Sequence, residues 1–390
     1  MEIPSEADLL ARAEALVPVL AERAQSCEDL RRVPDQTVED FVDAGFYRIA
    51  QPRRFGGYEH SPVVLFEVAM VLAKGCPSSA WCACLIGVHN WEAGLMDPRA
   101  GTDLWGEDDT TRFSSSYAPF GTVAPVDGGW ELSGRWPWSS GCDHCQWAIL
   151  GAIHRPESGP PDSLALLVPN TDYEIIDTWH VAGLKGTGSK DIELSPIFVP
   201  EHRVHRFADS YAMNNKGASE FTSPIYQLPF GIVFGMCLSS VALGIAKGAL
   251  ETFLAQMLDR RGAYDGAKAT EDPFVRERLS KASAIIHGNL LRFRAVFEEM
   301  HGHVDDKRTI PVDRRVHFKW EAQNIAQTSS DAVTLLFKAS GGSAVRLSNP
   351  MQRYFRDIHA ATNHAFLNAD KGSLNFGGVA LGDPNRDYAL

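Results

Sequence analysis

The 390-residue chain lacks several features that mark common classes of protein. Its first eight residues contain no basic stretch followed by an apolar one, so we expect no secretory signal and a cytoplasmic protein. Lysine and arginine do not cluster, and the net charge of −12 argues against a nucleic-acid partner. No solenoid repeat and no long low-complexity linker divides the chain, so we expect one integrated body.

Cysteine is sparse, and its seven occurrences fit reduced thiols better than a disulfide framework. Cys142 and Cys145 form one Cys-x-x-Cys pair, which can bind zinc or carry redox chemistry. The chain lacks a second such pair and a His-x-x-x-His to complete a tetrahedral site. We therefore expect no metal site, and a zinc- or thiol-based sensor is the alternative from a different class.

Charge is absent from residues 225–246, a run long enough to cross a bilayer. The run contains Pro229 with several glycines and serines, has no basic flank on its N-terminal side and continues into an amphipathic pattern. We predict a closely packed buried helix and no membrane contact.

The length exceeds one ordinary domain, and apolar periodicity divides the chain into three parts. Helical spacing and helix-start signals predict N-terminal helices over about 5–30, 35–45, 61–75 and 78–91. Short apolar runs between glycines and prolines predict strands over 121–126, 129–134, 147–153, 163–169 and 192–200. Long helical patterns return over about 228–261, 271–303, 312–342 and 349–374.

These patterns predict an α+β fold with three domains. An N-terminal α-helical domain covers residues 1–111, a central β-barrel-like domain covers 112–223, and a C-terminal four-helix bundle covers 224–390.

The most informative segment is 134–151, which joins glycine turns, a Ser-Ser pair and an apolar strand. Ser139 and Ser140 supply small hydroxyls and amide N–H groups beside Trp136 and Trp138. That combination suits a flat, heteroatom-rich ring. From these residues alone, a hairpin whose tryptophans are ordinary core is an equal alternative.

The order of helices, β domain and bundle, with the segments 179–191 and 350–357, resembles the acyl-CoA dehydrogenase superfamily over almost the whole chain. Within it, Ser-Ser-Gly-Cys-Asp-His at 139–144 and His-Ala-Ala-Thr-Asn-His at 359–364 are most similar to the two-component, reduced-flavin-dependent aromatic monooxygenases, the group of the 4-hydroxyphenylacetate 3-hydroxylase oxygenase component. Where the dehydrogenases of the superfamily carry a catalytic glutamate, this chain reads Thr-Asn-His-Ala at 362–365.

The resemblance implies an oxygenase component that receives reduced flavin, FADH2 or FMNH2, from a separate flavin reductase. O2 is the co-substrate, and a C4a-hydroperoxyflavin delivers oxygen to an aromatic ring, a phenol or an indole. It also implies a homotetramer or dimer. The residues choose neither between FMN and FAD nor among aromatic substrates.

The resemblance assigns catalytic roles to four residues. It places Ser140 near flavin N5, and His89, Ser115 and His364 in the substrate pocket. An imidazole can take or share the proton of a phenol at neutral pH, which makes the ring more nucleophilic. Without the resemblance, a core histidine is the more common reading of His89, and Ser115 could equally belong to a polar strand start.

A second set of residues is expected to bind the flavin. The loop 186–190 offers amide N–H groups, hydroxyls and a cation to phosphate, without the strand–turn–helix context of a Rossmann fingerprint. The expected cofactor-binding residues are Trp138, Ser139, Ser140, Trp179, Thr187, Ser189, Lys190, Arg353 and Arg356. Arg356 could instead form a structural ion pair with Asp357.

Two other enzyme classes stay open at this point. The same flavin intermediate could oxygenate a nitrogen or a sulfur atom. The chain could also be an acyl-CoA dehydrogenase-like flavoenzyme, which the missing glutamate opposes.

Overall fold

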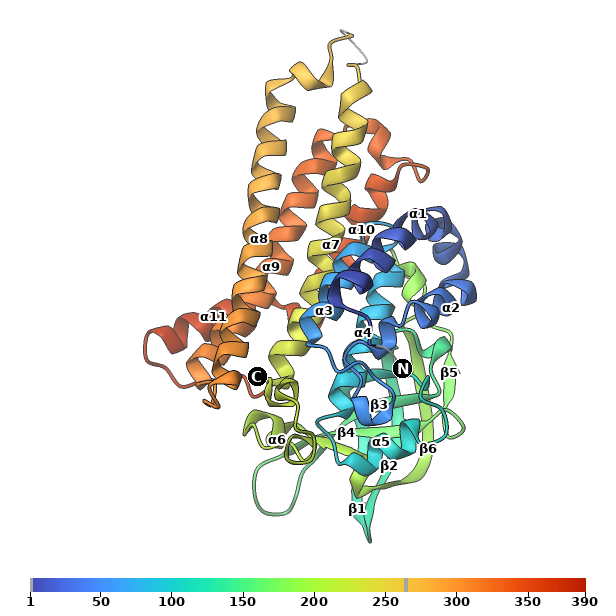
Figure 1. Cartoon of the computed structure of the whole chain (residues 1–390), viewed down its shortest axis with the longest axis vertical. Helices are drawn as coiled ribbons and strands as arrows, with labels where there is room; N and C mark the ends of the chain where they lie inside the picture. Colours follow the sequence, from blue (N-terminus) through green and yellow to red (C-terminus); the bar gives the residue numbers. More distant parts are fainter. Residues whose placement is uncertain (1–2, 263–265) are drawn as a thin grey trace.

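The computed structural model describes residues 3–262 and 266–390. Long C-terminal helices stand as a bundle above a lower part in which the N-terminal helices lie against a sheet (Figure 1). This is the α+β architecture that the sequence predicts, with helices at both ends and a sheet in the middle.

Five helices make up the N-terminal region: α1 (Glu6–Leu30), α2 (Asp35–Asp43), α3 (Pro62–Leu72), α4 (Pro77–Ala93) and α5 (Pro98–Trp105). Helix α1 begins with a capping box in which Ser5 and Asp8 exchange hydrogen bonds. Every residue of α4 is buried, because its small residues let α3, α7 and β1 approach closely. Helix α4 carries His89, one of the predicted catalytic residues, which is therefore buried.

The central sheet has seven strands: β1 (Phe113–Val126), β2 (Gly129–Ser139), β3 (Trp147–His154), β4 (Asp162–Pro169), β5 (Glu174–Ile176), β6 (Lys190–Pro200) and β7 (Val204–Arg206). Their order is β5-β6-β2-β1-β3-β4-β7, and only the β1–β3 pair is parallel among the described strands. The register of β1 against β3 shifts between Ser116 and Gly121, so the first half of β1 pairs with β3 and the second half with β2. The five predicted strands are confirmed, whereas β5 and β7 are too short for periodicity to reveal.

The bundle consists of α7 (Phe230–Asp259), α8 (Pro273–Asp305), α9 (Val312–Ala339) and α10 (Pro350–Thr362), and α11 (Ala369–Ala380) packs on α9. Helix α7 is long and apolar enough to cross a membrane, but 94% of its apolar window is buried inside the protein. The short helix α6 (Phe207–Tyr211) joins the sheet to the bundle.

The expectation of one helix over 349–374 is wrong. The helix ends at Thr362 with Asn363 as its C-cap, and His364 adopts an extended backbone with φ −64° and ψ 136°. The His364 imidazole accepts the backbone N–H of Phe366, so the side chain caps the following turn in place of a continued helix. This interruption is what turns the His364 ring away from a helix surface.

One apolar core joins the N-terminal helices to the bundle. It runs without a break from Leu9 in α1 to Leu390 at the C-terminus, and a second cluster fills the sheet around Trp136. A third cluster, which includes Ala93, Phe113 and Ile149, joins α4 and α5 to β1, β3 and β4, so the three parts pack together. The boundaries at 111/112 and 223/224 stay predictions.

Candidate active site

Ser140 begins a row of hydroxyl groups behind the end of β2. Trp81 Nε1 donates to Ser140 Oγ at 3.2 Å, and Ser140 Oγ lies 2.7 Å from Ser189 Oγ. Ser189 Oγ lies 2.7 Å from Thr187 Oγ1, which donates to the carbonyl of Leu184 at 2.9 Å. Since each hydroxyl has one proton, Thr187 accepts from Ser189 and Ser189 accepts from Ser140. The Ser140 proton is thus committed, and its oxygen offers only an acceptor.

Ser139 and Trp138 differ sharply although they are neighbours. Ser139 Oγ donates to Ser114 Oγ at 2.9 Å, and both residues are fully buried. The Trp138 side chain is 60% exposed, beside the exposed ring of Phe120, and its backbone has φ +70°. A left-handed backbone is strained for a bulky residue. The fold therefore presents an exposed, flat aromatic surface two positions before Ser140 in the chain, at some conformational cost.

His89 belongs to a buried polar network centred on Glu92. His89 Nδ1 lies 3.3 Å from Glu92 Oε2, and the Tyr117 hydroxyl donates to the same oxygen. His205 Nδ1 lies 2.8 Å from Glu92 Oε1. Burial alone would raise the pKa of the Glu92 carboxyl, but hydrogen bonds from His205 and His89 outweigh it and lower that pKa to about 2. Glu92 is therefore a buried carboxylate.

Ser115 lies beside the same network. It is partly buried on β1, and its hydroxyl is close enough to Tyr117 to lower the pKa of that phenol. Burial and the Glu92 carboxylate act in the other direction more strongly, so the pKa of Tyr117 is raised overall. The flanking residues Ser114 and Ser116 bond to Ser139 and to the carbonyl of Pro137 instead.

His364 is enclosed by aromatic rings after α10. Its ring centroid lies 6.0 Å from Trp81, 6.2 Å from Phe234 and 6.2 Å from Phe366. Burial lowers the pKa of the imidazole to about 4, so the ring is neutral at pH 7. Because Nδ1 accepts the Phe366 N–H at 3.3 Å, the single ring proton sits on Nε2. This tautomer makes Nε2 a hydrogen-bond donor.

Two aromatic residues join the predicted catalytic groups. Phe234 on α7 stacks 6.1 Å from His89 and lies 6.2 Å from His364, while Trp81 contacts both His364 and Ser140. The structure thus brings Ser140, His89 and His364 around one set of rings.

Sequence reasoning missed Glu92, Tyr117, His205, Trp81 and Phe234. Of these, only Glu92 carries a sequence signal, because it is the single acid in a helix of small and apolar residues, three positions after His89.

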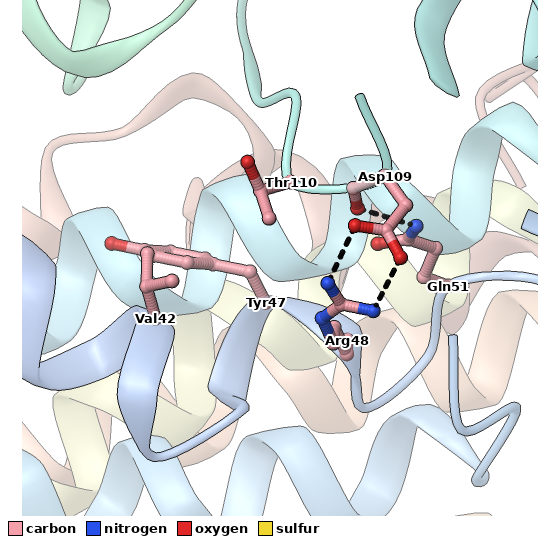
Figure 2. A pocket seen from close by; sticks show the side chains of 6 residues that line it. All are labelled: Val42, Tyr47, Arg48, Gln51, Asp109 and Thr110. Carbon is pink, nitrogen blue, oxygen red and sulfur yellow. Dashed lines mark hydrogen bonds and ion pairs between the residues drawn. The ribbon is translucent and has the colours of Figure 1, made fainter. Parts of the chain in front are cut away.

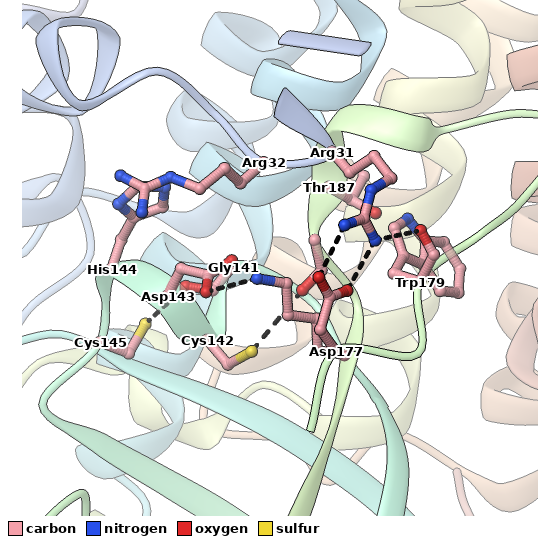
Figure 3. Close-up of polar contacts among 12 residues, drawn as sticks. Arg31, Arg32, Gly141, Cys142, Asp143, His144, Cys145, Asp177, Trp179 and Thr187 are labelled. Atoms are coloured by element: carbon pink, nitrogen blue, oxygen red, sulfur yellow. Dashed lines mark hydrogen bonds and ion pairs between the residues drawn. The ribbon is translucent and has the colours of Figure 1, made fainter. Parts of the chain in front are cut away.

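The other predicted flavin-binding residues of the β domain lie in or beside the loop that precedes β6, where Figure 3 shows Trp179 and Thr187. Lys190 Nζ donates to Asp143 Oδ1 at 2.8 Å, and Trp179 Nε1 donates to the carbonyl of Leu184 at 3.1 Å. Arg31, at the end of α1, donates to both carboxylate oxygens of Asp177 at 2.6 Å each. These contacts fix the loop that carries Thr187 and Ser189.

Arg353 and Arg356 lie on α10, behind that loop. Arg356 Nη2 donates to Glu28 Oε1 at 2.7 Å, and Arg353 Nε lies 3.6 Å from Glu28 Oε2. The Arg356–Asp357 ion pair weighed from the sequence is wrong, since Asp357 accepts the N–H of Leu184 at 2.6 Å. Neighbours in a helix point in different directions, so α1 supplies the counter-ion.

Cys142 and Cys145 donate to backbone carbonyls, of Gly188 at 3.6 Å and Gly141 at 3.4 Å. Burial raises the pKa of both thiols, that of Cys142 to about 12. Within residues 3–262 and 266–390, no three His, Cys, Asp or Glu side chains gather as a metal site would require.

Two surface hollows lie elsewhere. A small pocket is lined by Val42, Tyr47, Arg48, Gln51, Asp109 and Thr110. In it, the Arg48 guanidinium donates to both carboxylate oxygens of Asp109 (Figure 2). A groove of about 480 Å³ runs between α1, α7 and α10, lined in part by Lys74, Arg353 and Tyr354. Neither hollow is lined by His89, Ser140 or His364.

Comparison with known proteins agrees with this architecture. Residues 236–369 match the family described as acyl-CoA dehydrogenase, C-terminal domain. The chain is 36% identical to the flavin-dependent monooxygenase oxygenase subunit HsaA of Rhodococcus jostii (strain RHA1), covering 96% of this chain and 99% of that one. It is 32% identical to the oxygenase component of an FADH2-dependent resorcinol hydroxylase of Rhizobium sp. (strain MTP-10005), covering 97% and 96%.

The fold extends the agreement to three dimensions. The crystal structure of 3-HSA hydroxylase from Rhodococcus sp. RHA1 superposes with a TM-score of 0.94 at 35% identity, over 98% of this chain and 99% of that one. Similarity of this extent, over whole chains, includes every element that carries the site. The chain therefore belongs to the oxygenase components of flavin-dependent monooxygenases, enzymes built on the acyl-CoA dehydrogenase fold.

Proposed function

We propose that this protein hydroxylates a small phenol, using O2 and reduced flavin delivered by a separate reductase. The observation that carries the proposal is the shared set of rings, Trp81 and Phe234, that joins the Ser140 hydroxyl to the imidazoles of His89 and His364. The Ser140 hydroxyl can bond the edge of a flavin and the two imidazoles can bond the hydroxyl of a phenol, while aromatic side chains surround all three groups.

The residues present fit a reduced flavin. The Ser140 oxygen has a lone pair and no spare proton, and a reduced isoalloxazine carries an N–H at N5 that an oxidised one lacks. The exposed face of Trp138 offers a stacking surface for the same ring system. Bound reduced flavin supplies the electrons that activate O2.

The chain's own residues prepare the aromatic substrate. His89 lies between the rings of Phe113 and Phe234, with Nδ1 turned to Glu92, which leaves Nε2 to accept a phenol proton. His364 Nε2–H supports charge that develops on oxygen. Ser115, whose hydroxyl lies beside Tyr117, bonds the substrate hydroxyl in this proposal. The surrounding rings exclude water, which strengthens each of these contacts.

The phosphate contacts form a separate part of the proposal. Thr187, Ser189, Trp179 and Lys190 belong to one loop region, and the ammonium of Lys190 supplies the positive charge that a phosphate needs. Lys190 is paired with Asp143, and each side chain is only 13% exposed, so binding a phosphate requires Lys190 to leave a largely buried partner. Arg353 and Arg356, held here by Glu28, stay predicted contacts of the flavin or of a neighbouring subunit. A cytoplasmic homotetramer or dimer also stays a prediction.

The test is to load the protein anaerobically with FADH2 or FMNH2, mix it with oxygenated buffer and analyse products from resorcinol, 4-hydroxyphenylacetate and indole. We expect a hydroxylated phenol that forms only with reduced flavin and O2, and a flavin absorbance distinct from the reduced and oxidised forms. Oxygenation of an amine or thioether but of no phenol would contradict the proposal. Loss of the oxidised-flavin absorbance on addition of an acyl thioester would instead indicate acyl-CoA dehydrogenase activity.

A further inference from the structure

Glu92 is the one member of the site that contacts three proton donors from three different elements among the described residues. His89 is on the same helix, Tyr117 is on β1, and His205 is on β7, 113 positions further along the chain. Glu92, His89 and His205 are each at most 2% exposed. A buried network of this kind must satisfy every proton, so its hydrogen bonds determine where the protons sit.

The outer end of the network determines the charge of His205. Ser210 Oγ lies 2.8 Å from Asn215 Oδ1, which can only accept, so Ser210 donates its proton there. Ser210 therefore accepts from His205 Nε2, 2.6 Å away. His205 Nδ1 faces the Glu92 carboxylate at 2.8 Å and also donates. With both nitrogens donating, His205 is an imidazolium.

The inner end determines the tautomer of His89. The Tyr117 hydroxyl gives its proton to Glu92 Oε2, with which it makes the shorter of its two contacts. His89 Nδ1, near both Glu92 Oε2 and the Tyr117 oxygen, then has two acceptors and carries a proton. In the described part of the chain, no hydrogen bond ends on His89 Nε2.

Charge balance keeps His89 neutral. A buried carboxylate facing a single imidazole favours the imidazolium, which has no lone pair for a substrate. Here the His205 imidazolium already neutralises Glu92 through the other carboxylate oxygen. Glu92 can then hold the proton of His89 Nδ1 without drawing a second proton onto that ring.

We propose that Glu92, paired with His205, is a positioning residue that holds His89 as the neutral Nδ1–H tautomer and so reserves Nε2 for the hydroxyl of a phenolic substrate. The inference rests on the proposed function, which supplies the phenolic substrate. It deepens that function, because a hydrogen-bond acceptor at His89 Nε2 favours aromatic substrates that carry a hydrogen-bond donor. An aromatic compound without an O–H or N–H leaves Nε2 buried and unpaired, which costs binding free energy.

The first experiment reads the tautomers directly and needs no activity. In flavin-free protein labelled with ¹⁵N-histidine, long-range ¹H–¹⁵N spectra at pH 7 identify His89 and His205 by the signals lost in His89→Gln and His205→Gln. We expect His89 protonated on Nδ1 alone and His205 on both nitrogens. A His89 ring protonated on Nε2, or on both nitrogens, would overturn the inference.

The second experiment measures product formed per O2 consumed for the phenol found in the activity screen and for its ring-fluorinated analogue, whose hydroxyl is more acidic. Glu92→Gln should lower the ratio about tenfold or more for the parent phenol and clearly less for the analogue, since an ionised phenol needs no base. Glu67→Gln, which removes an acid paired with Arg294 on the surface of α3, is the matched control and should match the wild type.

The outcomes separate the two claims. Wild-type protein that hydroxylates no phenol contradicts the proposed function, whereas the spectra still decide the tautomer. A Glu92→Gln enzyme with the wild-type ratio, or with equal losses for both phenols, overturns the positioning role. If Glu92→Gln does not fold, the wild-type spectra and the same ratios measured in Glu92→Asp decide the matter.

Discussion

Trp81 on α4 donates its indole N–H to the hydroxyl of Ser140 at the end of β2, across 3.2 Å. This bond ties the helix that carries His89 to the loop that we assign to the flavin. It also starts the row of hydroxyls that ends at the carbonyl of Leu184, so the direction of each proton in that row is set from both ends.

Ser189→Ala interrupts the row of hydroxyls. Ser140 loses the acceptor for its proton and can turn that proton toward the flavin, where an acceptor is required. We expect the ratio of product to O2 to fall by about threefold to tenfold, a loss of roughly 1 kcal/mol typical of one hydrogen bond, with peroxide released instead. Peroxide and product assays in single turnover measure this. Ser239→Ala, which removes a buried hydroxyl that bonds to Met236 in the same helix, is the control, and an equal effect there would contradict the explanation.

His364 is expected to act as a neutral donor. His364→Ala should lower product per O2 by about tenfold to a hundredfold, and His364→Gln, which keeps an N–H, should lower it less. Burial places the pKa of His364 near 4, below the ordinary 6.5, so activity should show no titration of this ring between pH 6 and 9. Pre-steady-state assays across that range measure both effects. A loss in His364→Ala that appears only above pH 7 would identify a base and contradict the donor role.

The same pKa shift predicts an acid sensitivity of folding. Between pH 6.5 and about 4, the unfolded chain binds a proton at His364 that the folded protein does not. The stability contributed by the neutral ring is therefore complete above pH 6.5 and is lost as the pH falls through 4. Urea unfolding of wild type and His364→Gln at pH 5 and 7.5 should show a smaller pH effect in the variant.

Trp138→Gly separates flavin binding from folding. Glycine adopts φ +70° without strain, so removal of the indole should not destabilise the fold. The free energy of unfolding should stay unchanged or rise by up to about 1 kcal/mol, and the melting temperature should follow it. Loss of the exposed aromatic face should weaken reduced-flavin binding by about tenfold. Calorimetry and an anaerobic flavin titration measure the two effects. Unchanged flavin affinity would remove Trp138 from the site.

Asp357 should make folding less favourable as the pH rises. Burial and the nearby Glu28 carboxylate raise its pKa from 3.8 to about 7, against the hydrogen bond from the Leu184 N–H. The protonated form stabilises the fold fully below pH 3.8, and this contribution is lost as the pH rises to 7, a span worth at most roughly 4 kcal/mol. Asp357→Asn keeps the acceptor for Leu184 and should flatten this part of the curve in urea unfolding between pH 4 and 8. If the variant shows the same pH dependence of unfolding free energy as the wild type, that dependence comes from other groups.

Helix and strand positions followed from local pattern at most places. Short apolar runs between glycines and prolines identified β2, β3, β4 and β6, and the uncharged run before Lys247 identified the buried part of α7. The end of the helix before His364 was not predicted, because the spacing of apolar residues carries no information about an imidazole that accepts a hydrogen bond from the next turn. Ser140, His89 and His364 were predicted through a resemblance, because Ser140 taken alone could belong to an ordinary hairpin and His89 to the core.

The sequence by itself determined the order of helices and strands and, through the resemblance of its motifs, the family, because these depend on local pattern and on neighbouring residues. Only the tertiary structure decided how the protons are arranged. Glu92 and His205 are 113 positions apart, and Trp81 and Ser140 are 59 apart, yet each pair is within hydrogen-bond distance. A proton's place depends on which acceptor is nearest in space, and the packing of α4 against the sheet and α7 brings those acceptors together.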